Sequence, residues 1–273
     1  MNRTIVSFNG TEYSAKLEKY ILKLKPYGLI FFSKNIESKS QLLKFTSSIK
    51  ENFPDLKLAI DMEGGLVNRL RKIEGDLPLP EKPLDFLEFG KRIGSLLNFY
   101  RFDIDFAPVV DIDRGRKNNG LDRRYLGKSA EEVIEKAGYF LEGIESEGIT
   151  ACLKHFVGLS YTEIDSHFKL PEIERIIEED ELPFKVLSTP ERLILAAHIK
   201  VKNIGISTFS RKFTDRIKSF HKGDIICDDL GMKALGSLSL KEKLDKTFNA
   251  GFDFAIVTDM ITPFNPHDIS SFS

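Results

Sequence analysis

A carboxylate and a histidine stand two positions apart at Asp165 and His167, in a polar stretch that follows the apolar run Thr150–Leu153. In an extended segment residues i and i+2 point the same way, so the Asp165 carboxylate can reach the His167 ring. Such a hydrogen bond fixes the ring tautomer and stabilises the protonated ring, which suits proton transfer near neutral pH. Ordinary surface hydrogen bonds have the same spacing. Other features of the sequence are therefore needed to distinguish a catalytic pair from a surface contact.

Eight apolar runs rich in Ile, Val, Leu and Phe recur along the 273 residues and must position this pair. Near-continuous runs of this kind are typical of parallel strands buried on both faces. Ser38 with Gln41 and Ser129 with Glu132 fit capping boxes at two helix starts, and Gly148 fits the end of the second helix. The runs are Thr4–Phe8, Gly28–Phe32, Leu56–Ile60, Asp103–Ala107, Thr150–Leu153, Leu193–Ala197, Asp224–Cys227 and Phe252–Val257.

Strands that alternate with helices over this length predict an α/β protein with a (β/α)8 TIM barrel, in which residues 1–273 form one domain. A doubly wound open sheet is the alternative, and it is disfavoured because no glycine-rich phosphate-binding motif follows the first run. The segment 262–273 is short and polar, so we expect a barrel shortened at its C-terminus without a full eighth helix. Apolar surface left uncovered there favours a homodimer.

Composition narrows the classes of function. Hydrophobic residues make up 41% and charged residues 30%, and the formal net charge of -1 gives no electrostatic sign of a nucleic-acid or membrane partner. No apolar run approaches the roughly 20 residues of a membrane span, and the N-terminus lacks the features of a signal peptide. Cys152 and Cys227 lie inside apolar runs, which indicates buried, reduced thiols in a cytoplasmic protein. No ligand spacing suggests a metal, and we expect no cofactor.

Polar side chains stand at or just beyond the ends of most apolar runs, which is where a barrel carries its active site. Charged groups at so many strand ends favour one shared site. For His198 the sequence leaves open whether the ring is a core histidine with satisfied hydrogen bonds or a group that supports the site. His221 and His267 lie in polar surroundings and are expected at the surface. The strand-end residues are Asn35, Asp61, Glu63, Asp111, Lys154, His155, His198, Asp228, Asp229 and Asp259.

Motifs in a fixed order resemble those of glycoside hydrolase family 3. The segment Lys154–His167 is similar to the family's K-H-F-P-G-H-G-x-x-x-x-D-S-H without a gap, and Asp61–Leu70 is similar to D-Q-E-G-G-R-V-Q-R-F. Asp105–Asp111 resembles N-F-A-P-V-x-D, Asp228–Met232 matches D-D-L-x-M, and Gly28–Asn35 looks like the second strand. Within the family, the chain looks like the single-domain β-N-acetylglucosaminidases of bacterial cell-wall recycling.

This resemblance implies a retaining exo-β-N-acetylglucosaminidase that acts on a small glycoside, a muropeptide fragment of peptidoglycan with terminal N-acetylglucosamine. Most glycosidases place two carboxylates about the scissile bond, whereas this subgroup uses a carboxylate nucleophile and a histidine. Carried over, Asp228 is the nucleophile, His167 is the acid/base and Asp165 orients His167, while Asp229 is left with a structural role. The implied sugar-binding residues are Asp61, Arg69, Arg124, Lys154 and His155.

The chain also departs from the family pattern. Arg124 fits the family's arginine turn best, with Arg123 as a one-residue alternative. Val157 and Leu159 stand where the acid/base loop of the family has proline and histidine, and Leu66 replaces the arginine of G-G-R. These changes favour two alternatives, a sugar-binding relative with impaired catalysis and a family 3 glycosidase of other specificity. The retained nucleophile and acid/base residues favour an active enzyme.

Overall fold

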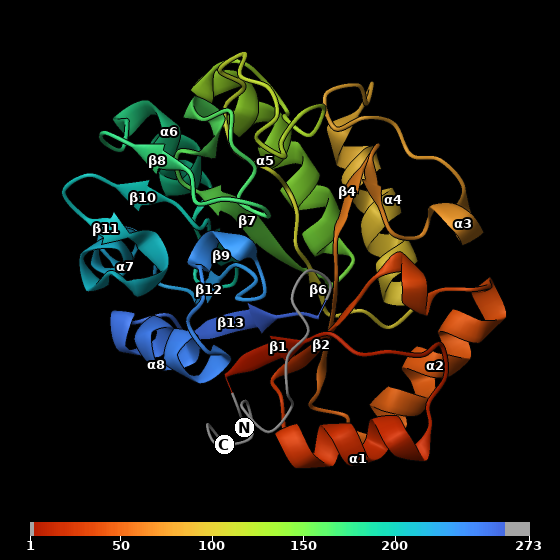
Figure 1. The fold of residues 1–273 in the computed structure, drawn as a ribbon. Helices are drawn as coiled ribbons and strands as arrows, with labels where there is room; N and C mark the ends of the chain where they lie inside the picture. The colour runs from red at the N-terminus through yellow and green to blue at the C-terminus, as the bar shows by residue number, and fades with distance from the viewer. Residues whose placement is uncertain (1–2, 260–273) are drawn as a thin grey trace.

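The computed structural model describes residues 3–259, and these include a closed barrel of eight parallel strands inside a ring of helices (Figure 1). Each predicted apolar run coincides with one barrel strand, so the barrel is confirmed and the open doubly wound sheet is wrong. The barrel closes because Ile5 pairs with Gly28 on one side and with Ile256 on the other. In barrel order the strands are β1 (Thr4–Val6), β2 (Gly28–Phe31), β3 (Lys57–Ile60), β6 (Ile104–Asp105), β7 (Thr150–Phe156), β9 (Leu193–Ala196), β12 (Ile225–Cys227) and β13 (Phe254–Val257).

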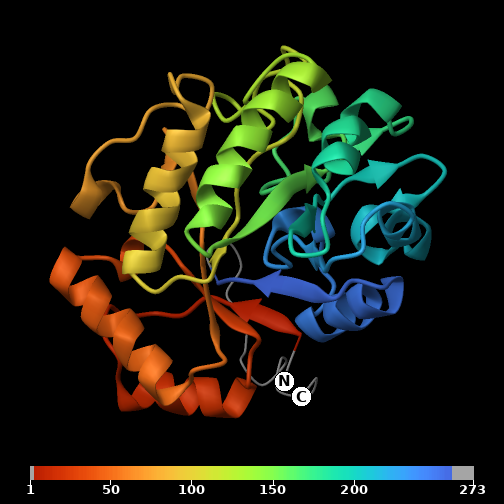
Figure 2. The same ribbon diagram turned by 180° about the vertical axis from the view of Figure 1, so that it is seen from behind.

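The connecting helices begin and end close to the positions that their sequence signals indicate. Ser38 and Gln41 form the predicted reciprocal capping box. Ser129 accepts the backbone N–H of Glu132, but the Glu132 carboxylate bonds the Lys128 N–H instead of closing the box. Figure 2 shows the helices from behind, packed on the outside of the strands. They are α1 (Ala15–Leu24), α2 (Lys39–Asn52), α3 (Arg71–Glu74), α4 (Phe86–Phe99), α5 (Ala130–Ser146), α6 (Glu178–Leu187), α7 (Arg211–Lys218) and α8 (Leu240–Ala250).

Alternate strand residues fill two apolar layers, as the two-residue period of a strand requires. One set points outward and packs under the helices, and Cys227 belongs to it. The other set fills the barrel, and Cys152 belongs to it; both thiols are buried and unpaired with each other. A barrel filled in this way is a packed core and has no open channel. Its interior residues are Ile5, Ile30, Ala59, Ile104, Phe106, Cys152, Leu193, Leu195, Ile226 and Ile256.

Two small sheets lie outside the barrel, and the apolar pattern does not predict either. The hairpin of β4 (Met62–Gly64) and β5 (Val67–Asn68) follows β3 directly. The second sheet joins β8 (Glu172–Ile173), β10 (Lys200–Val201) and β11 (Gly205–Ile206). Because β8 pairs with β10, this sheet fastens the segment after β7 to the segment after β9.

Several expectations concern residues 260–273, which lie outside the described residues. These are the reduced helix expected after the last barrel strand, the homodimer predicted from it and the position of His267. Across residues 3–259 no helix is long and apolar enough to cross a membrane. Over the same span, no three His, Cys, Asp or Glu side chains are grouped as a metal ion would require.

The expectation that His221 lies at the surface is wrong. The residue is only 2% exposed. Its Nδ1 lies 2.8 Å from the Ser188 Oγ, and its Nε2 lies 3.4 Å from the Asp224 carbonyl oxygen. A residue in a polar stretch of the sequence is therefore buried, and its ring nitrogens bond one group from a distant segment and one from three residues along the chain.

Candidate active site

A cavity of about 400 Å³ opens at the carboxyl ends of the barrel strands. It collects residues from the segments after β3, β6, β7 and β12, which lie far apart in the sequence. All eight of the predicted catalytic and sugar-binding residues lie on its wall: Asp61, Arg69, Arg124, Lys154, His155, Asp165, His167 and Asp228. Arg123 is exposed and does not line the cavity, so of the two candidate arginines only Arg124 lies on the cavity wall.

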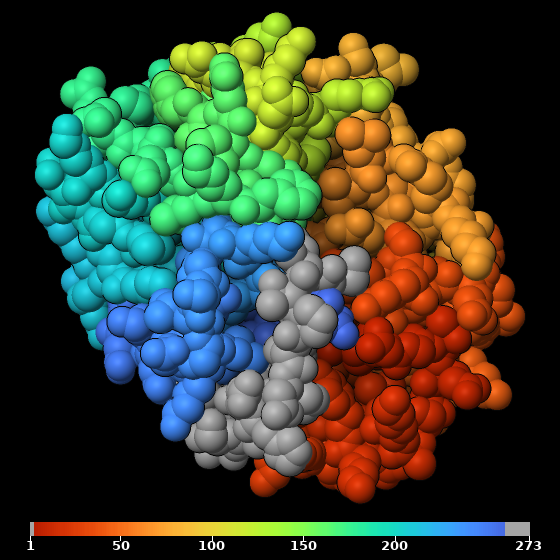
Figure 3. All heavy atoms as spheres, viewed as in Figure 1, coloured from red at the N-terminus to blue at the C-terminus, as the bar shows by residue number. Residues whose placement is uncertain are grey.

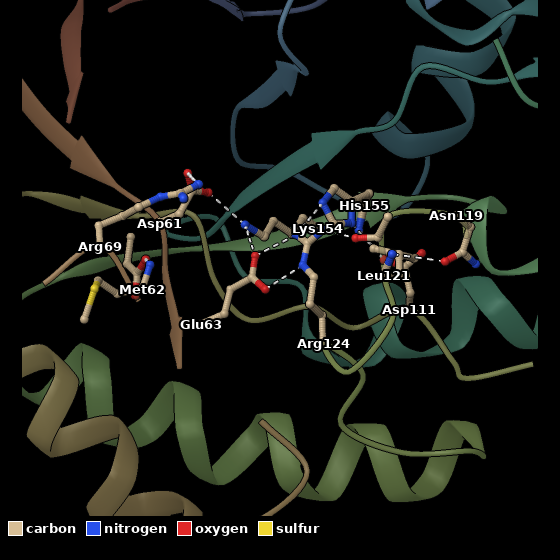
Figure 4. A network of polar contacts seen from close by, with 12 residues as sticks. Asp61, Met62, Glu63, Arg69, Asp111, Asn119, Leu121, Arg124, Lys154 and His155 are labelled. Carbon is tan, nitrogen blue, oxygen red and sulfur yellow. Dashed lines mark hydrogen bonds and ion pairs between the residues drawn. The ribbon is translucent and has the colours of Figure 1, made fainter. Parts of the chain in front are cut away.

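One wall of the cavity carries a network of ion pairs (Figure 4). The Lys154 Nζ lies 2.9 Å from the Asp61 Oδ1 and 2.6 Å from the Glu63 Oε1. Arg124 binds Glu63 in a bidentate manner, with Nε–Oε2 and Nη2–Oε1 distances of 2.8 and 2.7 Å. The Arg69 Nη2 lies 3.3 Å from the Asp61 Oδ2. Three cations thus share two carboxylates, and each side chain is held by at least one charged partner.

Neighbouring charges keep this network ionised despite its burial. Burial alone would raise the pKa of the Asp61 and Glu63 carboxyls, but nearby Lys154 and Arg124 lower both, to about 2 for Glu63. Burial would likewise lower the pKa of Lys154, and the two carboxylates raise it above its ordinary value. The wall therefore presents fixed charges at neutral pH, and charged groups form stronger hydrogen bonds to hydroxyl groups than neutral groups do.

A β-bulge in β7 explains how two adjacent residues reach the same cavity. Neighbours in a regular strand point to opposite faces. Here Lys154 pairs with Leu195 and Phe156 pairs with Ala196, so β7 has one extra residue between these pairs. The bulge lets both Lys154 and His155 line the cavity. The sequence places both residues after a strand that ends at Leu153, but β7 continues through Phe156.

Asp111 fixes the ring of His155. Its Oδ2 accepts the His155 backbone N–H at 2.7 Å and lies 3.0 Å from the ring Nδ1. Because a guanidinium can only donate, the His155 Nε2, 3.3 Å from the Arg124 Nη2, must accept, and the ring proton is on Nδ1. In the sequence, Asp111 and Glu63 stand out only as strand-end carboxylates. Glu63 holds the cations Lys154 and Arg124, and Asp111 holds the His155 ring, through contacts that no local pattern encodes.

The predicted hydrogen bond between Asp165 and His167 is present. The Asp165 Oδ1 lies 2.7 Å from the His167 Nδ1 and also accepts the His167 backbone N–H at 2.9 Å. The carboxylate fixes the proton on Nδ1, which leaves Nε2 as the atom that can exchange a proton with a bound molecule. Gly120, with φ of +80°, permits this arrangement because a Cβ there would lie 3.2 Å from the Asp165 Cγ.

The loop after β7, residues 157–170, packs on the turn that follows β12. The Lys233 N–H donates to the His167 carbonyl oxygen at 3.2 Å, and the Ser166 Oγ lies 3.9 Å from the Met232 Sδ. In Figure 3 the green surface of the chain after β7 adjoins the blue surface of the chain after β12. These contacts hold the histidine beside the segment that carries Asp228.

Apolar packing accounts for two departures in this loop. Val157 and Leu159 are both buried. Leu159 belongs to a small apolar cluster with Leu121 and Ile199, and its carbonyl oxygen accepts hydrogen bonds from the side chains of Asn119 and Thr162. The loop is therefore anchored by apolar contacts where the family has a histidine. Leu66, the third departure, is half exposed at the turn of the β4–β5 hairpin.

Asp228 and Asp229 take different positions at the end of β12. Asp228 lines the cavity and its Oδ1 accepts the Asp229 backbone N–H at 2.8 Å. Asp229 accepts the backbone N–H groups of Gly231 and Thr258 at 2.9 and 2.8 Å, which fits the structural role assigned to it. His198 is fully buried, with Nδ1 bonded to Thr208 and Nε2 2.9 Å from the Asp229 carbonyl oxygen. Both readings of His198 hold, since this satisfied core histidine also supports the Asp228–Asp229 turn.

Comparison with known proteins identifies the family of this chain. The glycosyl hydrolase family 3 N-terminal domain matches residues 4–265. The chain belongs to glycoside hydrolase family 3. It is 30% identical over 270 residues to a beta-hexosaminidase of Pseudomonas aeruginosa, a match that covers 93% of this chain and 81% of the relative. It is 32% identical over 257 residues to a beta-hexosaminidase of Neisseria meningitidis, which covers 84% of this chain and 70% of that protein.

Solved structures give the same family and fold. Native NagZ from Neisseria gonorrhoeae matches with a TM-score of 0.83 and 25% identity, over 99% of this chain and 83% of that one. The same protein in complex with N-trifluoroacetyl-D-glucosamine matches with a TM-score of 0.83 and 25% identity, over 99% of this chain and 84% of that one. As a member of family 3, the chain is a glycoside hydrolase with a (β/α)8 barrel.

Asp105 stands where the family motif has asparagine, and it lies buried near the ion-pair network. Its Oδ1 accepts the Met62 N–H at 2.8 Å, and its Oδ2 has no partner within residues 3–259. Burial raises the pKa of this carboxyl to about 8, and Asp61 and Glu63 add to the rise while Lys154 opposes it. The folded protein thus keeps a proton that the unfolded chain loses near pH 4.

This bound proton makes stability depend on pH. Between about pH 4 and pH 8 the folded state binds more protons than the unfolded state, so the Asp105 carboxyl costs stability that grows as pH rises. Asp105→Asn is expected to raise the free energy of unfolding, by a difference that increases by at most about 1.4 kcal/mol per pH unit in this window. Urea unfolding of both proteins at pH 5 and pH 8 measures it, and a difference that does not change with pH would contradict the assignment.

Proposed function

We propose that the chain is a retaining exo-β-N-acetylglucosaminidase in which Asp228 is the nucleophile and His167 is the acid/base. The observation that carries the proposal is that Asp228, the hydrogen-bonded Asp165–His167 pair and the charged wall line one cavity. Residues 1–273 would act as one catalytic domain.

Two steps follow from this arrangement. In the first, the Asp228 carboxylate attacks the anomeric carbon while the His167 Nε2 gives its proton to the departing glycosidic oxygen, so the C–O bond breaks as an ester bond forms. In the second, the neutral ring takes a proton from water, which attacks the anomeric carbon and releases Asp228. Asp165 holds the ring in one tautomer and stabilises its protonated form in both steps. Double inversion at the anomeric carbon retains its configuration.

The closed floor of the cavity supports the proposal of attack at a terminal sugar. Ile30, Leu195 and Ile256 belong both to the cavity wall and to the packed barrel interior, so a chain of sugars cannot pass through. One sugar ring enters, and its hydroxyls meet the charged wall. We assign those contacts to Asp61, Arg69, Arg124, Lys154 and His155, which offer both charge-assisted donors and acceptors.

The choice of N-acetylglucosamine is supported by the relatives. The curated proteins are beta-hexosaminidases, and the Neisseria gonorrhoeae NagZ binds N-trifluoroacetyl-D-glucosamine. The resemblance to enzymes of cell-wall recycling extends the proposal to muropeptide fragments in the cytoplasm as the physiological substrates.

Hydrolysis of two nitrophenyl glycosides tests the proposal. We expect release of nitrophenol from the β-N-acetylglucosaminide with a kcat/KM at least about 100-fold above that of the β-glucoside, because the two sugars differ by an amide group that a dedicated site binds. Preference for the glucoside would assign another family 3 specificity. Binding of N-acetylglucosamine without hydrolysis of either compound would assign a sugar-binding relative, although the intact Asp165–His167 bond opposes that outcome.

A further inference from the structure

Phe168 is an exposed aromatic residue beside the proposed acid/base. Its side chain is 68% exposed, and its ring centroid lies 6.5 Å from that of His167. The backbone around it is fixed, because the Phe168 N–H donates to the Asp165 carbonyl oxygen at 3.0 Å and the His167 carbonyl oxygen accepts from Lys233. The ring therefore lies beside a histidine of the cavity wall, on a turn held by hydrogen bonds, and its surface is open to a molecule that extends out of the cavity.

The direction of the reaction indicates what this ring would bind. The terminal sugar lies against the closed floor, and the His167 Nε2 has to meet the glycosidic oxygen. The leaving group is attached to the other side of that oxygen, so it extends from the cavity past His167 toward solvent. The next residue along the turn is Phe168, whose exposed ring lies beside the His167 ring just outside the cavity wall.

We infer that Phe168 forms the subsite for the leaving group and selects leaving groups that are themselves sugars. The apolar C–H face of the second sugar packs on the aromatic ring, which has the flat apolar surface that such a face requires. This inference rests on the proposed glycosidase function and deepens it, because it names the chemistry favoured on the leaving side of the bond.

Two substrates with the same terminal sugar test the inference. N,N′-Diacetylchitobiose has a sugar as its leaving group, whereas β-N-acetylglucosaminyl fluoride has a single atom that cannot reach Phe168. We expect Phe168→Ala to lower kcat/KM for the disaccharide by about five- to tenfold and to leave the fluoride within about twofold of wild type. Phe168→Tyr keeps the ring and should keep both rates.

The matched control is Phe99→Ala. Phe99 is 57% exposed and ends α4, at the opposite end of the barrel from the cavity, so its loss should change neither rate. Equal losses on both substrates in Phe168→Ala would overturn the inference, because the ring would then support the loop or the terminal sugar. Unchanged hydrolysis of the disaccharide would overturn it as well. Wild-type hydrolysis of the fluoride reports separately on the proposed function.

Discussion

Asp228→Asn is expected to lower kcat by roughly 10⁴-fold or more on every β-N-acetylglucosaminide, whatever its leaving group. The amide keeps the shape of the carboxylate and can still accept the Asp229 N–H, but it cannot form the glycosyl ester. Binding of N-acetylglucosamine should survive, because the proposed sugar contacts come from other segments. Steady-state rates and titration calorimetry measure the two effects.

Asp245→Asn provides the control for this variant. It makes the same change of charge at an exposed position on α8 and should leave kcat unchanged. Turnover of Asp228→Asn near the wild-type rate would show that another group is the nucleophile.

His167→Ala is expected to slow substrates according to the basicity of their leaving groups. A nitrophenolate departs without a proton, whereas a sugar alkoxide does not, so kcat/KM should fall by roughly 10²–10⁴-fold for a disaccharide and far less for the nitrophenyl glycoside. For the activated substrate the second step then limits turnover, because no base activates water. Added azide needs no general base and should restore that step.

Asp165→Asn should give a milder form of the same defect, since the ring loses its orientation and the stabilisation of its charged form. Equal losses across all leaving groups in His167→Ala, with no effect of azide, would mean that His167 positions the loop or the substrate and donates no proton.

The barrel could be predicted from sequence because its strands are buried on both faces. Each strand then reads as an apolar run, as in Leu193–Ala197 and Phe252–Val257, without reference to the rest of the chain. The pairs β4–β5 and β8–β10 could not be predicted, because these short strands mix polar and apolar residues, form no apolar run and are held by tertiary contacts. The bulge that extends β7 through Phe156 depends on the register with β9 and is invisible for the same reason.

The site was predictable to the extent that it is local. The spacing of Asp165 and His167 by two residues indicates their hydrogen bond directly. Glu63 gives no such signal, because its partner Lys154 lies 91 positions away in the sequence and meets it only once the barrel closes. The buried position of His221 likewise depends on Ser188, from a distant segment.

Trapping of the glycosyl-enzyme tests the central claim most directly. A ring-fluorinated N-acetylglucosaminyl fluoride has a good leaving group, so the first step, loss of fluoride, stays faster than hydrolysis of the intermediate. The glycosyl ester on the nucleophile therefore accumulates. Mass spectrometry of the denatured, digested protein is expected to find one added sugar on the peptide that contains Asp228, and none in Asp228→Asn. An adduct on another residue, or full turnover with no adduct in the wild-type protein, would contradict the assignment of Asp228 as the nucleophile.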